Sequence, residues 1–206
     1  MRYLYLHGFA SGPMSRKAQF FRERLATAGI VLEIPVLDEG DFEHLTVSRQ
    51  LDLVTRILDG QPATLIGSSL GGYVAALYAS QHPEIFRMVL LAPAFGFNSR
   101  WADTFGPEKL AAWRSTGAAE VYHYATRDMR RISSELLYDA ERHAGYPPCR
   151  QPALIFHGIN DQVVPLSASR RWAEENPQAR VVALESDHEL LNALEEVWQG
   201  CKEFLI

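Results

Sequence analysis

Short apolar runs alternate with stretches of helical periodicity along most of the chain, and this alternation limits the possible folds more than any other feature. The runs that we expect to be strands are residues 3–6, 30–36, 63–66, 88–92, 153–156 and 180–184. The helical stretches between and after them cover residues 20–28, 51–58, 73–80, 166–175 and 190–205. Strands that alternate with helices predict an α/β fold, a mostly parallel sheet of about six strands with helices on both faces. In such a sheet, ligands bind at the carboxyl ends of the strands.

The composition agrees with one folded domain. The chain has 206 residues, of which 47% are hydrophobic and 22% are charged, so disordered, collagen-like and coiled-coil classes are excluded. A chain of this length typically buries one core, and we expect a single domain over residues 1–206. The net charge of −5 does not supply the basic surface that phosphate backbones require, so we expect no nucleic-acid partner.

The chain shows no sign of a metal site, a disulfide framework or a membrane span. Its two cysteines, Cys149 and Cys201, have no paired Cys/His spacing, and we expect no metal site. No apolar stretch approaches the roughly 18 residues of a membrane-spanning helix, and the first residues lack a secretory signal. We therefore expect a cytoplasmic protein without stable membrane insertion, and the sequence does not indicate its oligomeric state.

The stretch between the fourth and fifth expected strands breaks the alternation. Residues 94–151 contain no good strand pattern but helix-like material at residues 107–114 and 118–144. A connection of this length is either functional or disordered, and its aromatic content argues against disorder. We interpret residues 94–151 as a helical lid inserted into the domain, named here the lid insert.

Two groups of side chains in the lid insert admit more than one interpretation. The aromatic residues either line an apolar acyl pocket or pack the lid onto the main domain. These residues are Trp101, Phe105, Trp113, Tyr122, Tyr124 and Tyr138. The arginines either bind an anionic acyl or carrier group or, as we favour, form a solvated helix face, and they are Arg127, Arg130 and Arg131.

Residues 67–71, Gly-Ser-Ser-Leu-Gly, match the G-x-S-x-G pattern of a nucleophile elbow. The motif follows the apolar run 63–66 and precedes the helical stretch 73–80, which is the required order of strand, sharp turn and helix. Glycines suit this turn because its backbone is strained and because the strand and the helix approach closely. We expect the Ser69 hydroxyl to be exposed at the carboxyl edge of the sheet. The alternatives are a glycine-rich turn with an incidental serine and a phosphate-binding turn.

A nucleophilic serine needs a base, and the base needs an orienting acid. Asp161 follows the expected strand 153–156 and His188 follows the strand 180–184, so both lie at the same sheet edge as Ser69. The chain order Ser, Asp, His is that of the α/β-hydrolase triad. The alternatives are a turn-capping role for Asp161 and a solvent-facing loop position for His188. As orienting acids, Asp187 is too close to His188 in sequence and Asp103 is a weaker choice.

Acyl transfer also needs hydrogen-bond donors for the oxyanion that develops on the substrate. The backbone N–H of Leu70, directly after the serine, supplies one donor. The N–H of Phe9, in the loop that leaves the first strand, is the best second candidate. We expect His7 and His157, near the ends of two strands, to make structural hydrogen bonds.

Together these motifs resemble the α/β-hydrolase superfamily and, in detail, the small bacterial YqiA-type esterases. The resemblance spans nearly the whole chain and is carried by residues 5–9, 15–18 and 67–73, by the Asp161 loop and by residues 187–188. It implies an α/β-hydrolase fold with Ser69 as nucleophile, His188 as base and Asp161 as orienting acid. It also implies hydrolysis of small esters or thioesters through an acyl-enzyme, with Phe9 and Leu70 as oxyanion donors and without metal or cofactor.

Two other classes of function remain open from the sequence. The same triad serves acyltransferases, carbon–carbon bond hydrolases and cofactor-free peroxidases, and the fold also occurs in binding proteins without catalytic activity. The presence of serine, acid and histidine together favours a hydrolase.

Overall fold

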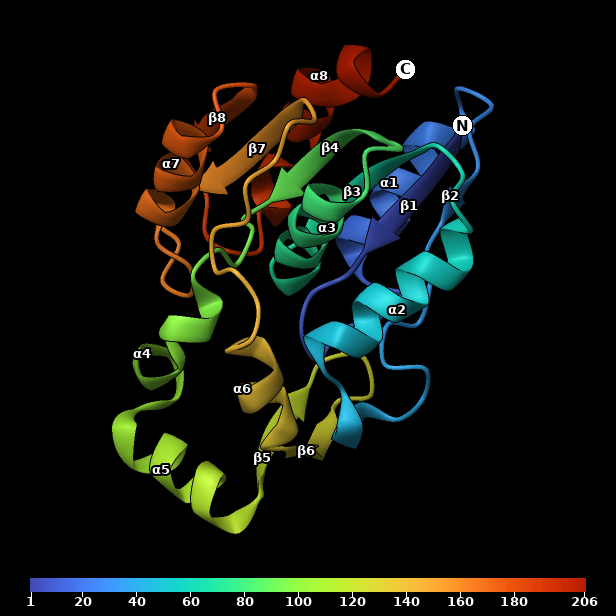
Figure 1. The fold of residues 1–206 in the computed structure, drawn as a ribbon. Helices are drawn as coiled ribbons and strands as arrows, with labels where there is room; N and C mark the ends of the chain where they lie inside the picture. Colours follow the sequence, from blue (N-terminus) through green and yellow to red (C-terminus); the bar gives the residue numbers. More distant parts are fainter.

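The core of the fold is a six-stranded sheet in which every strand pair is parallel, in the order β2-β1-β3-β4-β7-β8 (Figure 1). The computed structural model describes residues 1–206 apart from the side chains of residues 102 and 104. The strands are β1 (Arg2–Leu6), β2 (Leu32–Glu33), β3 (Ala63–Ser68), β4 (Ile85–Leu91), β7 (Ala153–Gly158) and β8 (Ala179–Leu184). The predicted α/β fold is confirmed, although β2 is much shorter than the apolar run 30–36.

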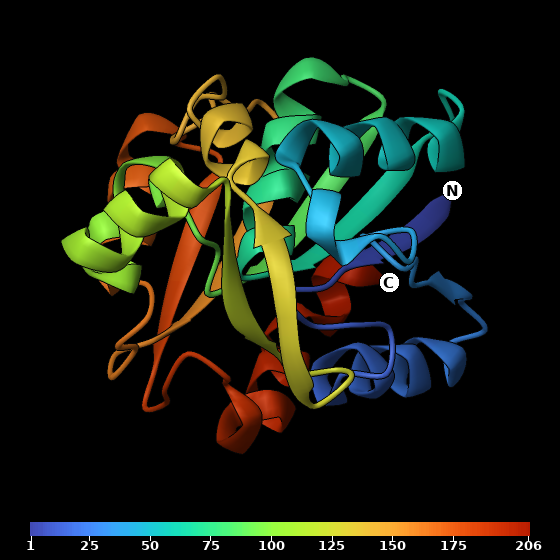
Figure 2. The ribbon, with the colours of Figure 1, turned by 90° about the horizontal axis from the view of Figure 1, so that it is seen from below.

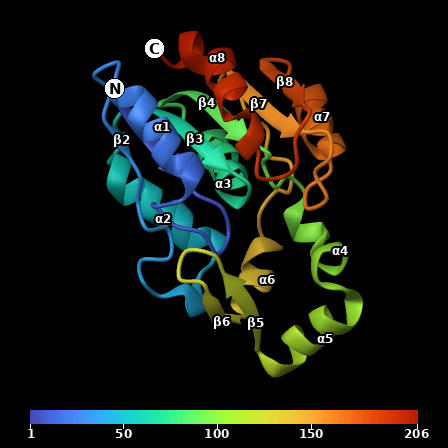
Figure 3. The ribbon, with the colours of Figure 1, turned by 180° about the vertical axis from the view of Figure 1, so that it is seen from behind.

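Helices cover both faces of this sheet. They are α1 (Arg16–Ala26), α2 (Val47–Leu58), α3 (Leu70–Gln81), α7 (Leu166–Glu175) and α8 (Leu194–Leu205). Helices α1 and α8 pack on one face, seen in front in Figure 3, and α2, α3 and α7 pack on the other. Each face therefore has its own apolar core, with the sheet between the two.

The helix ends follow local sequence signals. The Ser15 side chain accepts a hydrogen bond from the N–H of Ala18 at the start of α1, and the Thr46 side chain accepts one from Arg49 at the start of α2. Such caps satisfy donors that have no partner within the helix. Helix α3 differs because the side chain of its N-cap residue, Ser69, makes no capping hydrogen bond, and nearly all of its residues are buried.

The lid insert is not wholly helical, and the prediction of helix over residues 118–144 is wrong for residues 118–133. The insert contains α4 (Trp101–Phe105), α5 (Pro107–Thr116), β5 (Ala118–His123), β6 (Asp128–Ser133) and α6 (Glu135–Ala140). Strands β5 and β6 form an antiparallel hairpin. Burial alternates along it, since Val121 and His123 are buried whereas Tyr122 is exposed, and this period of two belongs to a strand.

The lid insert lies beyond the carboxyl ends of the sheet strands, in the lower half of Figure 1. Seen from below, the hairpin runs across that end of the sheet (Figure 2). The N–H of Tyr124 donates to the carbonyl of Ala10 at 2.7 Å, and the Ser48 hydroxyl donates to Asp139 at 2.6 Å. These hydrogen bonds tie the insert to the loop after β1 and to the start of α2.

None of the helices in the described part of the chain is both long enough and apolar enough to cross a membrane.

Packing of α1 and α8 against the sheet gives a stability prediction. The Phe21 ring is fully buried between Tyr5 and Trp198, with ring-centroid distances of 6.1 and 6.3 Å. We expect Phe21→Ala to lower the free energy of unfolding by about 3–5 kcal/mol, because a large buried side chain leaves a cavity. Urea denaturation measures this, with Phe86→Ala as the control because the Phe86 side chain is 50% exposed. Equal losses in both variants would contradict the prediction.

Candidate active site

Ser69 occupies a strained turn between β3 and α3. Its backbone has φ 52° and ψ −119°, a conformation that residues other than glycine rarely adopt. A Cβ atom on Gly67 would lie 2.5 Å from the carbonyl oxygen of Gly71, and one on Gly71 would overlap the carbonyl oxygen of Leu6. Only glycine therefore fits at these two positions, and the turn has the geometry expected of a nucleophile elbow.

The structure brings Ser69, His188 and Asp161 into one hydrogen-bonded chain. The His188 Nε2 atom lies 3.0 Å from the Ser69 Oγ atom, and the Nδ1 atom of the same ring lies 2.7 Å from Asp161 Oδ2. Asp161 follows β7 and His188 follows β8, so parallel strands deliver all three side chains to the same edge. With Nδ1–H donating to the carboxylate, Nε2 is left as an acceptor for the serine proton.

The Asp161 carboxylate has no exposed surface, yet its environment favours the charged form. The N–H groups of Val163 and Val164 both donate to Oδ1 at 2.8 Å, while His157 and His188 approach Oδ2. Burial raises the pKa of Asp161, but the hydrogen bonds from His157, His188 and Val164 lower it more, so its pKa lies well below the usual range. The carboxylate is therefore ionised at neutral pH.

His157 contributes more to this network than the sequence indicates. The expectation of structural hydrogen bonds is confirmed, because its Nδ1 atom lies 2.8 Å from the Ser169 hydroxyl and its Nε2 atom 2.9 Å from the Val164 carbonyl. In addition, Nε2 lies 3.1 Å from Asp161 Oδ2. The His157 ring is fully buried, and it contacts the same carboxylate oxygen as His188. The only sequence feature that could indicate this contact is the spacing of four residues between His157 and Asp161.

The competing residues have other positions. Asp187 accepts hydrogen bonds from the N–H groups of Glu189 and Leu190, so it caps the turn after His188. Asp103 lies exposed on α4. His7 makes structural contacts as expected: its Nδ1 atom is 3.0 Å from the Gly8 carbonyl, and its Nε2 atom accepts from the Leu37 N–H at 3.3 Å.

The two predicted oxyanion donors flank Ser69. Leu70 is the first residue of α3, and Phe9 follows Gly8 in the loop after β1. Neither backbone N–H donates to any residue that the structure describes, so both are available. A Cβ atom on Gly8 would lie 3.4 Å from the Ser69 Cβ atom, which shows how closely this loop approaches the serine.

A cavity of about 1120 Å³ opens beside Ser69 and His188, between the sheet edge and the lid insert. Phe105, Tyr122 and Tyr124 line it. Trp101 and Trp113 are buried, and Phe105 stacks on the Trp101 ring and meets the Trp113 ring edge to face. Tyr138 is 48% exposed and does not line this cavity. The two interpretations of the lid aromatics therefore apply to different residues, some lining the cavity and others packing the insert.

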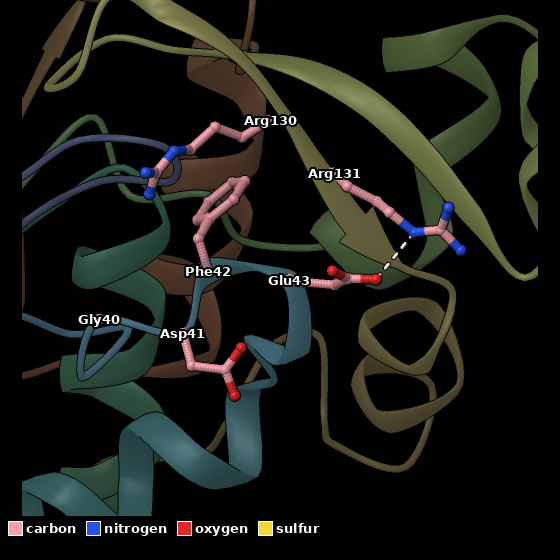
Figure 4. Close-up of a pocket in the computed structure, with 6 residues that line it drawn as sticks. All are labelled: Gly40, Asp41, Phe42, Glu43, Arg130 and Arg131. Carbon is pink, nitrogen blue, oxygen red and sulfur yellow. Dashed lines mark ion pairs between the residues drawn. The ribbon is translucent and has the colours of Figure 1, made fainter.

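The arginines of the lid insert lie on the hairpin, so a solvated helix face is the wrong description. Arg127 is the turn residue between β5 and β6 and lines the large cavity. Arg130 and Arg131 line a separate small hollow together with the loop that carries Phe42 and Glu43 (Figure 4). There Arg131 forms an ion pair with Glu43, with 2.7 Å between Nε and Oε1. This pair joins the hairpin to the main domain.

Among the described residues, no group of three or more His, Cys, Asp and Glu side chains is placed to hold a metal ion. Both cysteines are buried, and burial raises the pKa of Cys149 to about 11 and that of Cys201 to about 12. Their thiols therefore stay protonated at neutral pH and are poor nucleophiles or ligands.

A protein-family model described as "Uncharacterised protein family (UPF0227)" matches residues 2–205. The pimeloyl-[acyl-carrier protein] methyl ester esterase of Aromatoleum aromaticum is 29% identical over 158 residues, with 58% of this chain and 63% of that protein covered. The biotin biosynthesis bifunctional protein BioHC of Teredinibacter turnerae is 33% identical over 154 residues, with 68% of this chain and 26% of that protein covered. The chain thus spans less than two thirds of the length of either relative.

Solved structures with the same fold include esterases and lipases. Est1E from Butyrivibrio proteoclasticus, with bound ferulic acid, has a TM-score of 0.82 at 21% identity, covering 98% of this chain and 86% of its own. Mouse alpha/beta hydrolase domain-containing protein 10 has a TM-score of 0.83 at 21% identity, and the match covers 98% of this chain and 88% of the mouse chain. The monoacylglycerol lipase of Paleococcus ferrophilus has a TM-score of 0.78 at 20% identity, and the match covers 98% of this chain and 93% of the lipase chain. The α/β-hydrolase fold predicted from the sequence is confirmed.

The lowered pKa of Asp161 makes its contribution to stability depend on pH. Its pKa is lower in the folded than in the unfolded chain, so the carboxylate stabilises the fold fully above the unfolded value of about 3.9 and less as the pH falls toward the folded value. We expect the difference in free energy of unfolding between wild type and Asp161→Asn to shrink as the pH falls below about 4. Urea titrations at a series of pH values measure this difference, and a gap that widens below pH 4 would contradict the assignment.

Proposed function

The chain belongs to the UPF0227 family, and from that premise we propose that it is a serine hydrolase that cleaves carboxylic esters or thioesters through an acyl-enzyme. The hydrogen-bonded chain from Ser69 through His188 to Asp161, built on a strained turn, is the observation that carries this proposal. In this proposal Ser69 is the nucleophile, His188 the general base and Asp161 the orienting acid.

Acylation begins when the Ser69 Oγ atom attacks the carbonyl carbon of the ester. As the C–O bond forms, the serine proton passes to His188 Nε2, 3.0 Å away, and the carbonyl π electrons move onto its oxygen. The N–H groups of Phe9 and Leu70 stabilise that oxyanion. The tetrahedral intermediate then collapses, the bond to the leaving group breaks, and His188 returns the proton to the departing alcohol or thiol.

Deacylation repeats these steps with water as the nucleophile. His188 takes a proton from water, the hydroxide oxygen attacks the acyl carbon, and the bond to Ser69 Oγ breaks as the proton returns to serine. Asp161 remains ionised in both halves, because four hydrogen-bonding groups satisfy its carboxylate. Its charge stabilises the imidazolium that forms transiently.

The relatives support ester hydrolysis in broad terms. One curated relative is a methyl ester esterase, and the structural neighbours include a monoacylglycerol lipase. The cavity of about 1120 Å³ is slightly larger than the usual range for small-molecule sites, so it has room for a short to medium acyl group together with a leaving group. We further propose that residues 1–206 form one domain and that the lid insert, which supplies one wall of the cavity, sets the acyl length.

The central test is removal of the serine hydroxyl. We expect Ser69→Ala to reduce kcat/KM for a p-nitrophenyl ester by at least about 10⁴-fold, because the nucleophile and the proton donor to His188 are both lost. Turnover is followed by p-nitrophenolate release, and circular dichroism checks that the fold is retained. Ser80→Ala is the control, since the Ser80 hydroxyl donates only to the Leu77 carbonyl among the described residues.

A fluorophosphonate probe separates the proposed activity from the alternatives. Labelling of wild type but not of Ser69→Ala is expected of an active serine nucleophile. Absence of labelling in wild type would favour a catalytically silent binding protein. Labelling without ester turnover would favour acyl transfer, carbon–carbon hydrolysis or peroxidation with the same triad.

A further inference from the structure

A lysine with little exposed surface lines the same cavity as Ser69 and His188. Lys17 is the second residue of α1, and it lines this cavity although the whole residue is only 8% exposed. Its Nζ atom lies 4.0 Å from Glu189 Oε2, at the outer limit of an ion pair, and the Glu189 side chain is 63% exposed. Among the described residues, none accepts a hydrogen bond from the Lys17 ammonium.

This position is unfavourable for a lysine in the empty protein. Burial of a charge without hydrogen-bonding partners costs free energy, and the partial positive charge of a helix N-terminus adds repulsion. Burial lowers the pKa of Lys17, while the carboxylates of Glu189, Asp161 and Asp187 raise it. An anion bound in the cavity would supply both the missing charge and the missing acceptor.

A second polar group in the cavity also lacks a partner. Tyr5, in β1, is fully buried and lines the cavity with Lys17. Its hydroxyl lies near that of Ser68, but it forms no hydrogen bond of normal geometry with any residue that the structure describes. Buried hydroxyl groups are nearly always paired. A ligand oxygen that reaches both Lys17 and Tyr5 would satisfy two buried donors at once.

The rest of the cavity lining favours an anion. The lining residues that carry positive charge outnumber those that carry negative charge, although the chain as a whole has a net charge of −5. The positive ones are Arg16, Lys17, Lys109 and Arg127, and the negative ones are Glu120 and Glu189. Of these six residues, only Lys17 is buried. An anion in this cavity of net positive charge would therefore interact most strongly with Lys17.

We propose that the Lys17 ammonium and the Tyr5 hydroxyl form a subsite for an anionic group, a carboxylate or a phosphate, that the ester substrate carries. This inference rests on the proposed function and names its substrate class, which is esters with a negative charge at some distance from the reacting carbonyl. Monoesters of dicarboxylic acids are the simplest members. The anion accepts hydrogen bonds from both donors, and Glu189, being exposed, turns toward solvent.

The kinetic test compares a charged ester with a neutral one. We expect wild type to favour p-nitrophenyl hemiglutarate over p-nitrophenyl pentanoate by roughly 10- to 100-fold in kcat/KM, corrected for spontaneous hydrolysis, as hydrogen bonds to charged groups predict. This ratio should fall to about 1 in Lys17→Met and should be largely retained in Lys17→Arg. Tyr5→Phe, which keeps the ring, should lower the ratio several-fold.

Lys109→Met is the matched control, because it removes the same charge from an exposed position in the same cavity. We expect it to change the ratio by less than about threefold, since exposed charges interact weakly. Equal effects of Lys17→Met and Lys109→Met would overturn the subsite in favour of general attraction. An unchanged ratio in Lys17→Met would also overturn it, while Ser69-dependent hydrolysis of the neutral ester would leave the proposed function intact.

A binding measurement tests the subsite without turnover. Glutarate or inorganic phosphate should raise the Tm of Ser69→Ala but not that of the double variant Ser69→Ala, Lys17→Met. Stabilisation by one anion and not the other identifies the preferred group. The subsite is overturned if neither anion raises the Tm of Ser69→Ala. It is also overturned if the anions raise the Tm of the double variant as much as that of Ser69→Ala. Without ligand, Lys17→Met should not lower the Tm, and a lower Tm together with an unchanged kinetic ratio would assign Lys17 a structural role.

Discussion

The close contact between the start of α3 and the ends of β1 and β3 determines most of the geometry of this molecule. At Gly67 and Gly71 the backbones approach so closely that any side chain would overlap a carbonyl group. Helix α3 therefore lies directly against the centre of the sheet, and the backbone of Ser69 is forced into a strained conformation. Such strain costs about 1–3 kcal/mol. It persists because nearly all of α3 is buried, so relaxing the turn would mean moving a core helix.

The loops after four strands come together beside this contact. Since every strand pair of the sheet is parallel, the segments after β1, β3, β7 and β8 leave the same edge. The packing of α3 fixes Ser69 there, and β7 and β8 bring Asp161 and His188 to it. Asp161 is in turn held by His157 and by two backbone N–H groups. The orientation of His188 thus depends on a rigid carboxylate within the core.

The sequence predicts the site better than it predicts the lid. Strand ends, glycine spacing and chain order predict that Ser69, Asp161 and His188 lie together, and the structure places them in one hydrogen-bonded chain. Strand β2 is shorter than its apolar run because it is an edge strand, where Val31 and Val36 remain largely exposed.

The hairpin of the lid insert was missed for a different physical reason. Its turn places Arg127 at φ 61° instead of the glycine or asparagine that usually marks a tight hairpin. The long alanine- and arginine-containing stretch around it also suits a helix in isolation. Tertiary contacts decide the outcome, because the buried side of β5 and β6 packs against residues 42–44 of the main domain. The contact between His157 and Asp161 also cannot be predicted from the sequence, because the sequence alone does not determine how two side chains in a turn are oriented.

Asp161 and Lys17 show two solutions to the same energetic problem. Both are charged side chains with little exposed surface close to Ser69 and His188, and burial of a charge is unfavourable unless partners stabilise it. The protein surrounds Asp161 with four hydrogen-bonding groups, so this charge is stabilised before any substrate arrives. Among the described residues, Lys17 has only the exposed Glu189 carboxylate within ion-pair distance, at 4.0 Å. Because apolar side chains of similar size would fill the same volume at lower cost, the retained charge at Lys17 is best explained by a partner that enters with the substrate.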